Sequence, residues 1–265
     1  MSKHITLPQK LHALPARQDC SEDENARFAE SYVDMLSQIS QHTQSAMSII
    51  LSVQRTPQNI TGGVVGFMLA LDGWIESVIE MHTGRFPVPQ CKPGCFSCCR
   101  MKVSALAPEV VTIAHYIKAM PGAQALIDRL TSSVSRLQYD NSHVNHEPYT
   151  LCPLLEHELC SVYPVRPFAC RAWHSLDIQA CGKAYESGKA CMLVPLEGFS
   201  VLAADAVQVG IALAMHEAGI QMNPMKLLPA LLVALNDEGL ADRWASGEKV
   251  FNKALFEGPE PSWLR

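Results

Sequence analysis

The chain has 265 residues, enough for one or two domains, and its 48% hydrophobic residues exclude general disorder. With 21 Lys and Arg against 26 Asp and Glu, the formal net charge of −5 gives no general attraction to nucleic acid or anionic lipid. No apolar run reaches the about 20 residues that a bilayer requires, and the N-terminal sequence lacks the apolar core of a secretory signal. We therefore expect a cytoplasmic protein with no membrane or general nucleic-acid partner.

The N-terminal part of the chain is predicted to form a helical hairpin. Residues 1–20 are polar and aperiodic, so we expect a flexible arm. Ser21 and Glu24 have the spacing of a capping box, and apolar residues then repeat with a helical period over 24–54. A second helix over 60–82 has the most regular apolar stripe in the chain. Two amphipathic helices with a short connection favour an antiparallel hairpin.

Two features of the second helix need interpretation. Gly62 and Gly66 lie one turn apart, which predicts the close approach of a neighbouring helix. Asp72, Glu76 and Glu80 form an acidic row at intervals of four residues. Such a row suits a carboxylate metal site, but it more often marks a solvated helix face, and we prefer the second interpretation.

Further helices are predicted on both sides of a loop-rich middle. Pro108 and Glu109 suit the first turn of a helix that ends near Met120, and another apolar stripe follows over 126–137. The helical period returns after Gly198. Between these segments the sequence is rich in turn-forming residues and has no long helical or strand period. The middle of the chain is therefore expected to be irregular.

The C-terminal part is also predicted to be helical. An Asn-Pro pair begins a helix over 224–236, and a short helix follows over 248–256. The predicted fold class is all-α, with a helical hairpin and C-terminal helices around an irregular, metal-stapled cysteine-rich insert. Residues 21–265 are expected to form one domain, with the metal-binding region at 88–195.

Cysteine is the most informative residue type. The chain has ten, and nine of them lie between Cys91 and Cys191, which leaves only Cys20 apart. A disulfide scaffold is typical of a small secreted chain with cysteines along its whole length. Clustered thiols in a larger cytosolic chain more often bind metal, although disulfides and plain core cysteines stay open as alternatives.

The cysteines form two blocks. The first is CKPGCFSCC, and the second follows from Cys152 onward, with Cys191 at its end. The predicted metal ligands are Cys91, Cys95, Cys98, Cys99, Cys152, Cys160, Cys170 and Cys181. Short spacings let several thiolates of one loop face one metal, and distant cysteines then close the site. Adjacent side chains in extended backbone point to opposite sides, so the Cys98–Cys99 pair suggests either two sites or one cluster with spare cysteines.

Charged residues near the thiols are candidate supporting groups. A tetrathiolate metal site is anionic, and Arg166 and Arg171 flank Cys170, so their guanidinium groups are expected to donate to sulfur and offset this charge. The alternative is that they are surface arginines. His157 and His174 lie in the same block and can replace a thiolate, but a lone histidine is more often not a ligand.

The two blocks together resemble a bacterial cysteine-cluster family named after YkgJ, whose domain is described as zinc- or iron-chelating. The resemblance covers about residues 88–195 and differs from many relatives in having three residues, not two, between the first two cysteines. The family pattern maps onto Cys91, Cys95, Cys98, Cys99, Cys152, Cys160, Tyr163, Arg166, Pro167, Cys170 and Arg171. A flagellin lysine methylase that is associated with an iron–sulfur cluster resembles the same family, which implies that chemistry on a substrate is possible.

The preferred function is a cytoplasmic protein that holds an iron–sulfur cluster, preferably 4Fe–4S, or iron, with a redox or accessory role and a possible protein partner. The excess of thiolates and the adjacent cysteine pair favour a cluster over one zinc ion. The alternatives are a zinc-stapled helical interaction module and a cluster-dependent enzyme resembling the methylase; no catalytic residue can be named. Cys91, Cys95 and Cys98 also have the spacing of radical-SAM enzymes, but the absence of alternating strands and helices argues against that class.

Overall fold

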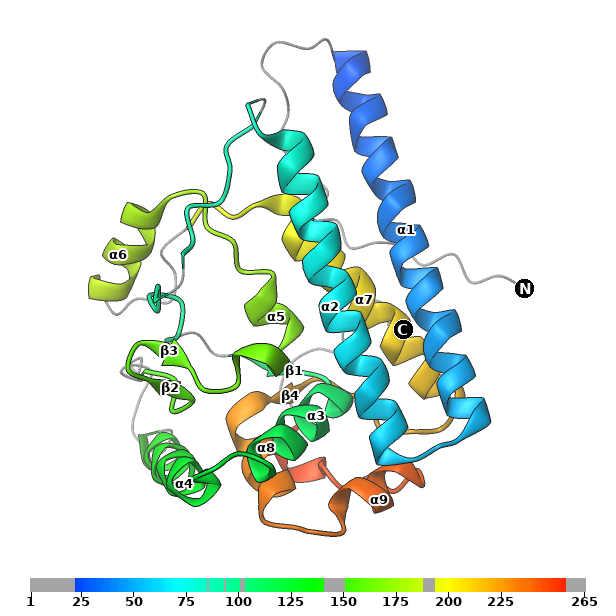
Figure 1. Ribbon diagram of the computed structural model, residues 1–265, viewed down its shortest axis with the longest axis vertical. Coiled ribbons are helices and arrows are strands. Elements are labelled where there is room, and N and C mark those ends of the chain that lie inside the picture. Colours follow the sequence, from blue (N-terminus) through cyan, green and yellow to red (C-terminus); the bar gives the residue numbers. More distant parts are fainter. Residues whose placement is uncertain are drawn as a thin grey trace.

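The computed structural model describes residues 22–84, 86–92, 94–100, 103–140, 151–187 and 194–255. Within these ranges the chain is mostly helical, and its strands are only two residues long, so the predicted all-α class is confirmed (Figure 1). The α-helices are α1 (Glu22–Val53), α2 (Pro57–His82), α3 (Ala107–Lys118), α4 (Ala123–Asp140), α5 (Phe168–Arg171), α6 (Ile178–Ser187), α7 (Gly198–Glu217), α8 (Leu227–Leu235) and α9 (Leu240–Ala245). That a metal holds the cysteine-rich insert together stays a prediction.

The predicted N-terminal hairpin is present. Helices α1 and α2 run antiparallel and are joined by a short turn (Figure 1). Thr56 begins α2, because its hydroxyl accepts a hydrogen bond from the backbone N–H of Asn59 at 3.3 Å, and Pro57 occupies the first helical position. The periodic apolar residues of α2, such as Ile60 and Val64, are fully buried. Periodicity and local capping thus determine this part of the fold.

The core helix of the molecule is α7, which is buried along most of its length and packs along α1. A methyl group at Gly210 would meet the backbone oxygen of Ser40 and would lie 2.9 Å from the backbone nitrogen of Gln44. This crossing therefore requires glycine. The prediction for Gly62 and Gly66 is wrong, because both are exposed and have open space around them: they lie on the face opposite the buried stripe.

Two short antiparallel ladders complete the fold. Strand β1 (Ser104–Ala105) pairs with β4 (Met225–Lys226), and β2 (Leu155–Glu156) pairs with β3 (Leu159–Cys160). The first ladder corrects the predicted start of the helix at 224, because residues 225–226 extend to pair with β1 and α8 begins only at Leu227. The backbone N–H of Leu227 donates a hydrogen bond to the Val103 carbonyl at 3.0 Å, which continues this pairing.

The predicted helix over 248–256 is wrong within the described residues. Only a 3₁₀ turn, η3 (Asn252–Ala254), is formed there, and α9 lies before it. The side chain of Gln221 accepts a hydrogen bond from the backbone N–H of Phe251 at 3.0 Å, and the indole of buried Trp244 donates to the Gln221 carbonyl at 2.8 Å. These tertiary bonds and the burial of Trp244 and Phe251 override the local helical preference.

Helices α2 and α7 are each long and apolar enough to cross a membrane, judged by length and composition alone. In their most apolar windows 28% of α2 and 78% of α7 are buried inside the molecule. The core helix of a soluble protein satisfies the same criterion, and α7 is packed as such a helix. The finding is therefore weak evidence for a membrane protein.

Candidate metal centre

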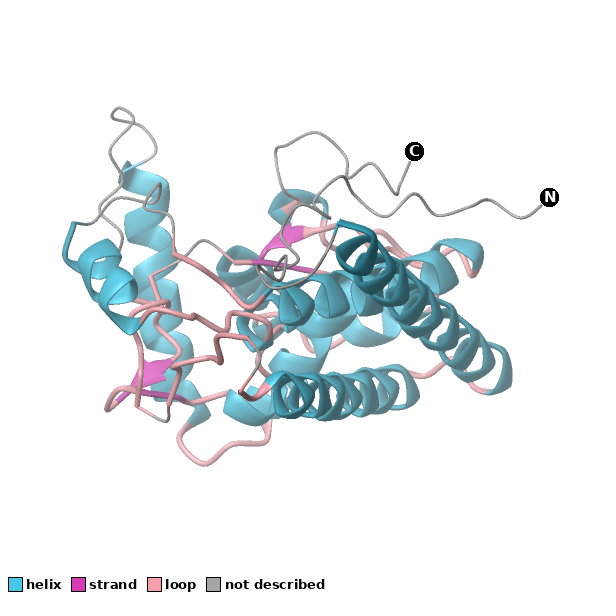
Figure 2. Cartoon of the chain, turned by 90° about the horizontal axis from the view of Figure 1, so that it is seen from above, coloured by secondary structure: helices cyan, strands magenta, loops and turns pink. Residues whose placement is uncertain are grey.

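The second cysteine block forms a series of short elements on one side of the helical body (Figures 1 and 2). The hairpin β2–β3 turns at His157 and Glu158, which have φ of 48° and 64°. Its register places Cys160 opposite Leu155, and the backbone N–H of Leu155 donates to the Cys152 carbonyl at 3.0 Å. The hairpin therefore brings Cys152 and Cys160 to the same end of the ladder.

A buried carboxylate fixes the helix that carries Cys170. Glu109, on the first turn of α3, is fully buried and accepts hydrogen bonds from the backbone N–H of Phe168 at 2.9 Å and of Leu106 at 2.8 Å. It accepts a further bond from the side-chain amide of Gln208 on α7, at 2.9 Å. Burial raises the pKa of Glu109, and these bonds oppose the rise. The sequence predicted the first-turn position of Glu109 but not this anchoring role.

The two cysteine blocks are in contact. The backbone N–H of Cys152 donates to the Cys99 carbonyl at 2.7 Å, which ties the ends of the two blocks together. A second tie joins Gln90 to Ser175 through a backbone bond of 2.8 Å. Ser175 in turn donates its N–H to the sulfur of Cys91 at 3.3 Å. Segments that are far apart in sequence thus lie side by side, as the sequence analysis expected.

Four thiols, from Cys98, Cys152, Cys160 and Cys170, influence one another electrostatically, and we call them the inner thiols. Burial raises the pKa of Cys170, and Cys152, Cys98 and Cys160 add to that rise. Burial raises the pKa of Cys152 to about 11, with further contributions from Cys160 and Cys98. A hydrogen bond with Cys99 and then burial raise the pKa of Cys98. The protein environment thus favours neutral thiols at all three positions.

Three thiols, from Cys91, Cys95 and Cys181, form a second set, the outer thiols. Partial desolvation of its sulfur raises the pKa of Cys91, although the residue as a whole is exposed, and Cys95, Cys98 and Cys181 add to the rise. Burial raises the pKa of Cys181 as well, with contributions from Cys95 and Cys98. Cys91 is exposed, whereas Cys181, on α6, is buried. Cys98 is therefore the residue within electrostatic range of both sets.

The two predicted supporting arginines have different surroundings. Arg166 stacks over Tyr163, 4.4 Å from the ring centre, and its charge opposes the pKa rise of Cys98, Cys160 and Cys170. Arg171 is buried and bonds to the Asp72 carboxylate of α2, to the Pro164 carbonyl and, at 3.1 Å, to the Arg166 carbonyl. Arg166 is thus the guanidinium that acts on several thiols, while Arg171 ties this region to α2.

The acidic row of α2 is divided by this contact. Asp72 is half-buried and pairs with Arg171, so it is not part of a purely solvated face. Glu76 and Glu80 are exposed, as predicted for a solvated face. The pairing depends on a tertiary contact between α2 and the cysteine region, which no spacing within α2 reveals.

Unpaired hydrogen-bond donors surround the cysteines. Six buried side-chain N and O atoms in the described part of the chain have no hydrogen-bond partner. Two of them, in Ser40 and Thr43, belong to α1; the others are Nε of Arg100, Nη2 of Arg129, Oγ of Ser161 and Nε of Arg166. Buried donors without acceptors are costly. An anionic metal–thiolate group would supply acceptors at this place, so the donor set fits such a group.

Two of these arginines are held close to the thiols by other bonds. Arg129 of α4 donates to the Pro153 carbonyl at 2.7 Å and opposes the pKa rise of Cys152. Arg100 donates to the Tyr185 carbonyl at 2.6 Å and stacks over the Tyr185 ring at 4.5 Å. Arg129 lies on a separate helix, so no motif spacing in the sequence connects it to the cysteines.

The structure does not show an assembled coordination sphere. Among the described residues, no group of three or more His, Cys, Asp or Glu side chains is placed to hold a single metal ion. The Nδ1 atom of His174 lies 3.1 Å from the hydroxyl of Ser200, and this hydroxyl donates to the Glu197 carboxylate at 2.6 Å. His157 occupies an exposed hairpin turn. Cys20 and Cys191 lie outside the described residues.

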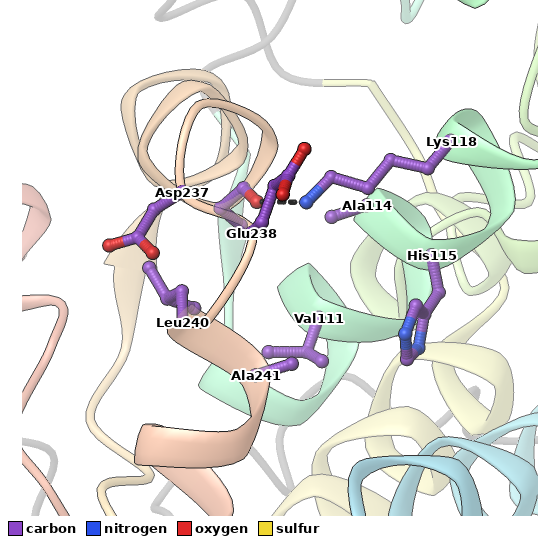
Figure 3. A pocket seen from close by; sticks show the side chains of 9 residues that line it. Val111, Ala114, His115, Lys118, Asp237, Glu238, Leu240 and Ala241 are labelled. Atoms are coloured by element: carbon purple, nitrogen blue, oxygen red, sulfur yellow. Dashed lines mark hydrogen bonds between the residues drawn. The ribbon is translucent and has the colours of Figure 1, made fainter.

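A cavity of about 290 Å³ lies elsewhere in the molecule, between α3, the end of α8 and α9 (Figure 3). His115 and Lys118 line one side and Asp237 and Glu238 the other, while Lys118 donates to the Ala234 carbonyl at 2.9 Å. None of the cysteines lines this cavity. It is therefore separate from the candidate metal centre.

Comparison with known proteins yields no matching family model, no matching curated protein and no matching solved structure. The resemblance to the YkgJ-type family accordingly stays a prediction from the two cysteine motifs. The residues of this chain alone therefore indicate its function.

Proposed function

We propose that this chain is a cytoplasmic iron–sulfur protein in which the inner thiols, Cys98, Cys152, Cys160 and Cys170, hold the cluster. The observation that carries the proposal is the contact of the two cysteine blocks, through the Cys152 N–H and the Cys99 carbonyl at 2.7 Å, beside buried donors that lack acceptors. A cluster held there would exchange electrons, which suits a redox or accessory role.

Metal binding at these thiols would have to displace their protons. Burial raises the pKa of Cys152, Cys160 and Cys170, so without a compensating charge these side chains remain protonated. Thiols that only fill a core do not require three arginines with unpaired buried nitrogens around them. Iron can replace the thiol protons, and the resulting anionic sulfur group can then accept from Arg129 and Arg166.

The number of thiols favours a cluster over a single zinc ion. A structural zinc requires only four ligands, whereas nine cysteines, two of them adjacent, lie between Cys91 and Cys191. A multi-iron body is larger and accepts ligands around its outside. Cys99 and the outer thiols then remain outside the ligand set.

The proposal is tested on anaerobically purified, untagged full-length protein by measuring iron, acid-labile sulfide and zinc per chain. We expect iron and sulfide in equal amounts with a broad absorbance near ~400 nm. Cys98→Ser and Cys170→Ser should each remove most of the iron, whereas Cys20→Ser, on the N-terminal arm, should retain it. A colourless protein with stoichiometric zinc would contradict this proposal and support the alternative, a zinc-stapled interaction module.

A further inference from the structure

The outer thiols have a geometry that the proposed cluster does not use. Cys91 lies on the first cysteine loop and is exposed, whereas Cys181 lies on α6 and is 7% exposed. Ser175 connects the two segments. Its backbone N–H donates to the Cys91 sulfur at 3.3 Å. Its hydroxyl donates to the Asp177 carbonyl at 2.9 Å, and this carbonyl also accepts the backbone N–H of Cys181 at 3.2 Å. One serine thus links an accessible thiol to the first turn of α6, which carries a covered thiol.

The surrounding backbone fixes this contact. The Gln90 N–H donates to the Ser175 carbonyl at 2.8 Å, and the Gln90 side chain accepts from the N–H of Ile178, the first residue of α6, at 3.1 Å. Asp177 then caps α6 by accepting from Gln179 and Ala180 at 2.8 and 3.0 Å. The segment before Cys91 and the start of α6 are therefore held against each other.

From this placement we infer that Cys91 and Cys181 are a redox-active pair that forms a reversible disulfide, with Cys91 as the attacking and Cys181 as the resolving thiol. The co-reactant is a disulfide, such as oxidised glutathione. The Cys91 thiolate attacks one of its sulfurs, forms a mixed disulfide and releases the first thiolate. Cys181 then attacks the Cys91 sulfur and releases the second. Two thiols of the chain are oxidised, one external disulfide is reduced, and both leaving thiolates take up the two protons that the cysteines lose.

The disulfide would act on the position of α6. This helix contacts the first cysteine loop through Tyr185, whose carbonyl accepts from Arg100 and whose ring packs edge-on against Phe96 at 5.6 Å. A covalent bond from Cys181 to Cys91 would fix α6 to that loop, and its reduction would release this restraint. Access to the outer side of the cysteine region would then depend on the thiol–disulfide balance.

The test uses the full chain, incubated with increasing oxidised glutathione under anaerobic conditions and then alkylated. We expect the loss of two free thiols, a Cys91–Cys181 peptide pair in the mass-spectrometric map, and full recovery with excess reduced glutathione. A disulfide that joins Cys91 to Cys95, or a stable Cys91–glutathione adduct in the native chain, would overturn the pairing.

Variants separate this pair from the metal ligands. Cys181→Ser should stop the reaction at the Cys91–glutathione adduct, and Cys91→Ser should abolish it, both with unchanged iron content. Cys20→Ser is the matched control and should react like the native chain. If Cys91→Ser or Cys181→Ser lost iron as fully as Cys170→Ser, these thiols would be ligands and the inference would be wrong. Mapping the native chain decides the pairing even if a variant does not fold.

Discussion

The helical body and the cysteine region are stabilised by different interactions. The body, built on α1, α2 and α7, is held by apolar stripes whose residues, such as Leu36, Met68 and Val207, are fully buried. The cysteine region has short elements, and side chains that bond to its backbone carbonyls and N–H groups hold it, as Arg129 does at Pro153 and Glu109 at Phe168. The cysteine region shares the apolar core through residues such as Val162 and Phe168, but it adds these polar bonds and, by our proposal, a metal.

Metal removal should give the largest difference in stability between the helical body and the cysteine region. Chelation under reducing conditions is expected to lower hydrogen-exchange protection in 151–187, because metal-binding energy adds there to the burial of core residues such as Leu154, Val162 and Phe168. Helices α1, α2 and α7 should retain most of their protection. The measurement is hydrogen exchange by mass spectrometry before and after complete metal loss. Unchanged protection in 151–187 would contradict a structural metal.

Replacing the anchoring carboxylate should strongly destabilise the junction between the two regions. Glu109→Ala leaves buried N–H donors of Leu106, Phe168 and Gln208 without an acceptor, so we expect a loss of about 3 kcal/mol in the free energy of unfolding. Urea unfolding measures it. The exposed Glu76→Ala is the matched control and should change stability by less than about 0.5 kcal/mol. A loss below about 1 kcal/mol for Glu109→Ala would show that this anchor is unimportant.

A pair of glycine substitutions tests the packing of the body alone. Gly210→Ala places a methyl group against Ser40 and Thr43 and should cost about 1–3 kcal/mol of stability. Gly62→Ala meets no atom within 4 Å and should stabilise α2 by about 0.5–1 kcal/mol. Thermal unfolding measures both, and iron content should stay the same. Equal effects at the two positions would mean that α1 and α7 do not cross as closely as described.

The smallest predicted effect is a dependence of stability on pH. Burial lowers the pKa of His82, which bonds with the Tyr32 hydroxyl. The unfolded chain therefore takes up this proton at a higher pH than the folded chain, and stability is lost as pH falls below about 6.5. The slope contributed by this residue can reach about 1.4 kcal/mol per pH unit. His82→Gln should flatten the curve measured by urea unfolding at several pH values, whereas the exposed His216→Gln should leave it unchanged.

The body was predictable because its local signals agree with its tertiary contacts. The stripe that contains Ile60 and Val64 gave the correct buried face of α2, and the same stripe places Gly62 and Gly66 on the other face, so their outward position was also readable. The start of α8 was not, because the pairing of β4 with β1 joins residues far apart in sequence. Helix α6 was missed although Asp177 provides a capping signal, because turn-forming residues surround it.

The candidate site was predictable in its residue types but not in its arrangement. Cysteine spacing identified both blocks, which are in backbone contact at Cys99 and Cys152, while a common metal centre for their thiols stays a prediction. The division into inner and outer thiols depends on where the β2–β3 hairpin and α6 place Cys160 and Cys181, which spacing does not specify. Arg129 comes from another helix, so only the folded chain brings it to Cys152.

The position of Glu109 has a mechanical consequence. One carboxylate accepts from the side chain of Gln208 on α7 and from the backbone of Phe168 on α5, two residues before Cys170. A slide of α7 along its axis would pull on the same carboxylate that holds α5. Force applied to the helical core, for example by a partner that binds α1 and α7, would therefore reach the helix that carries Cys170 through two hydrogen bonds.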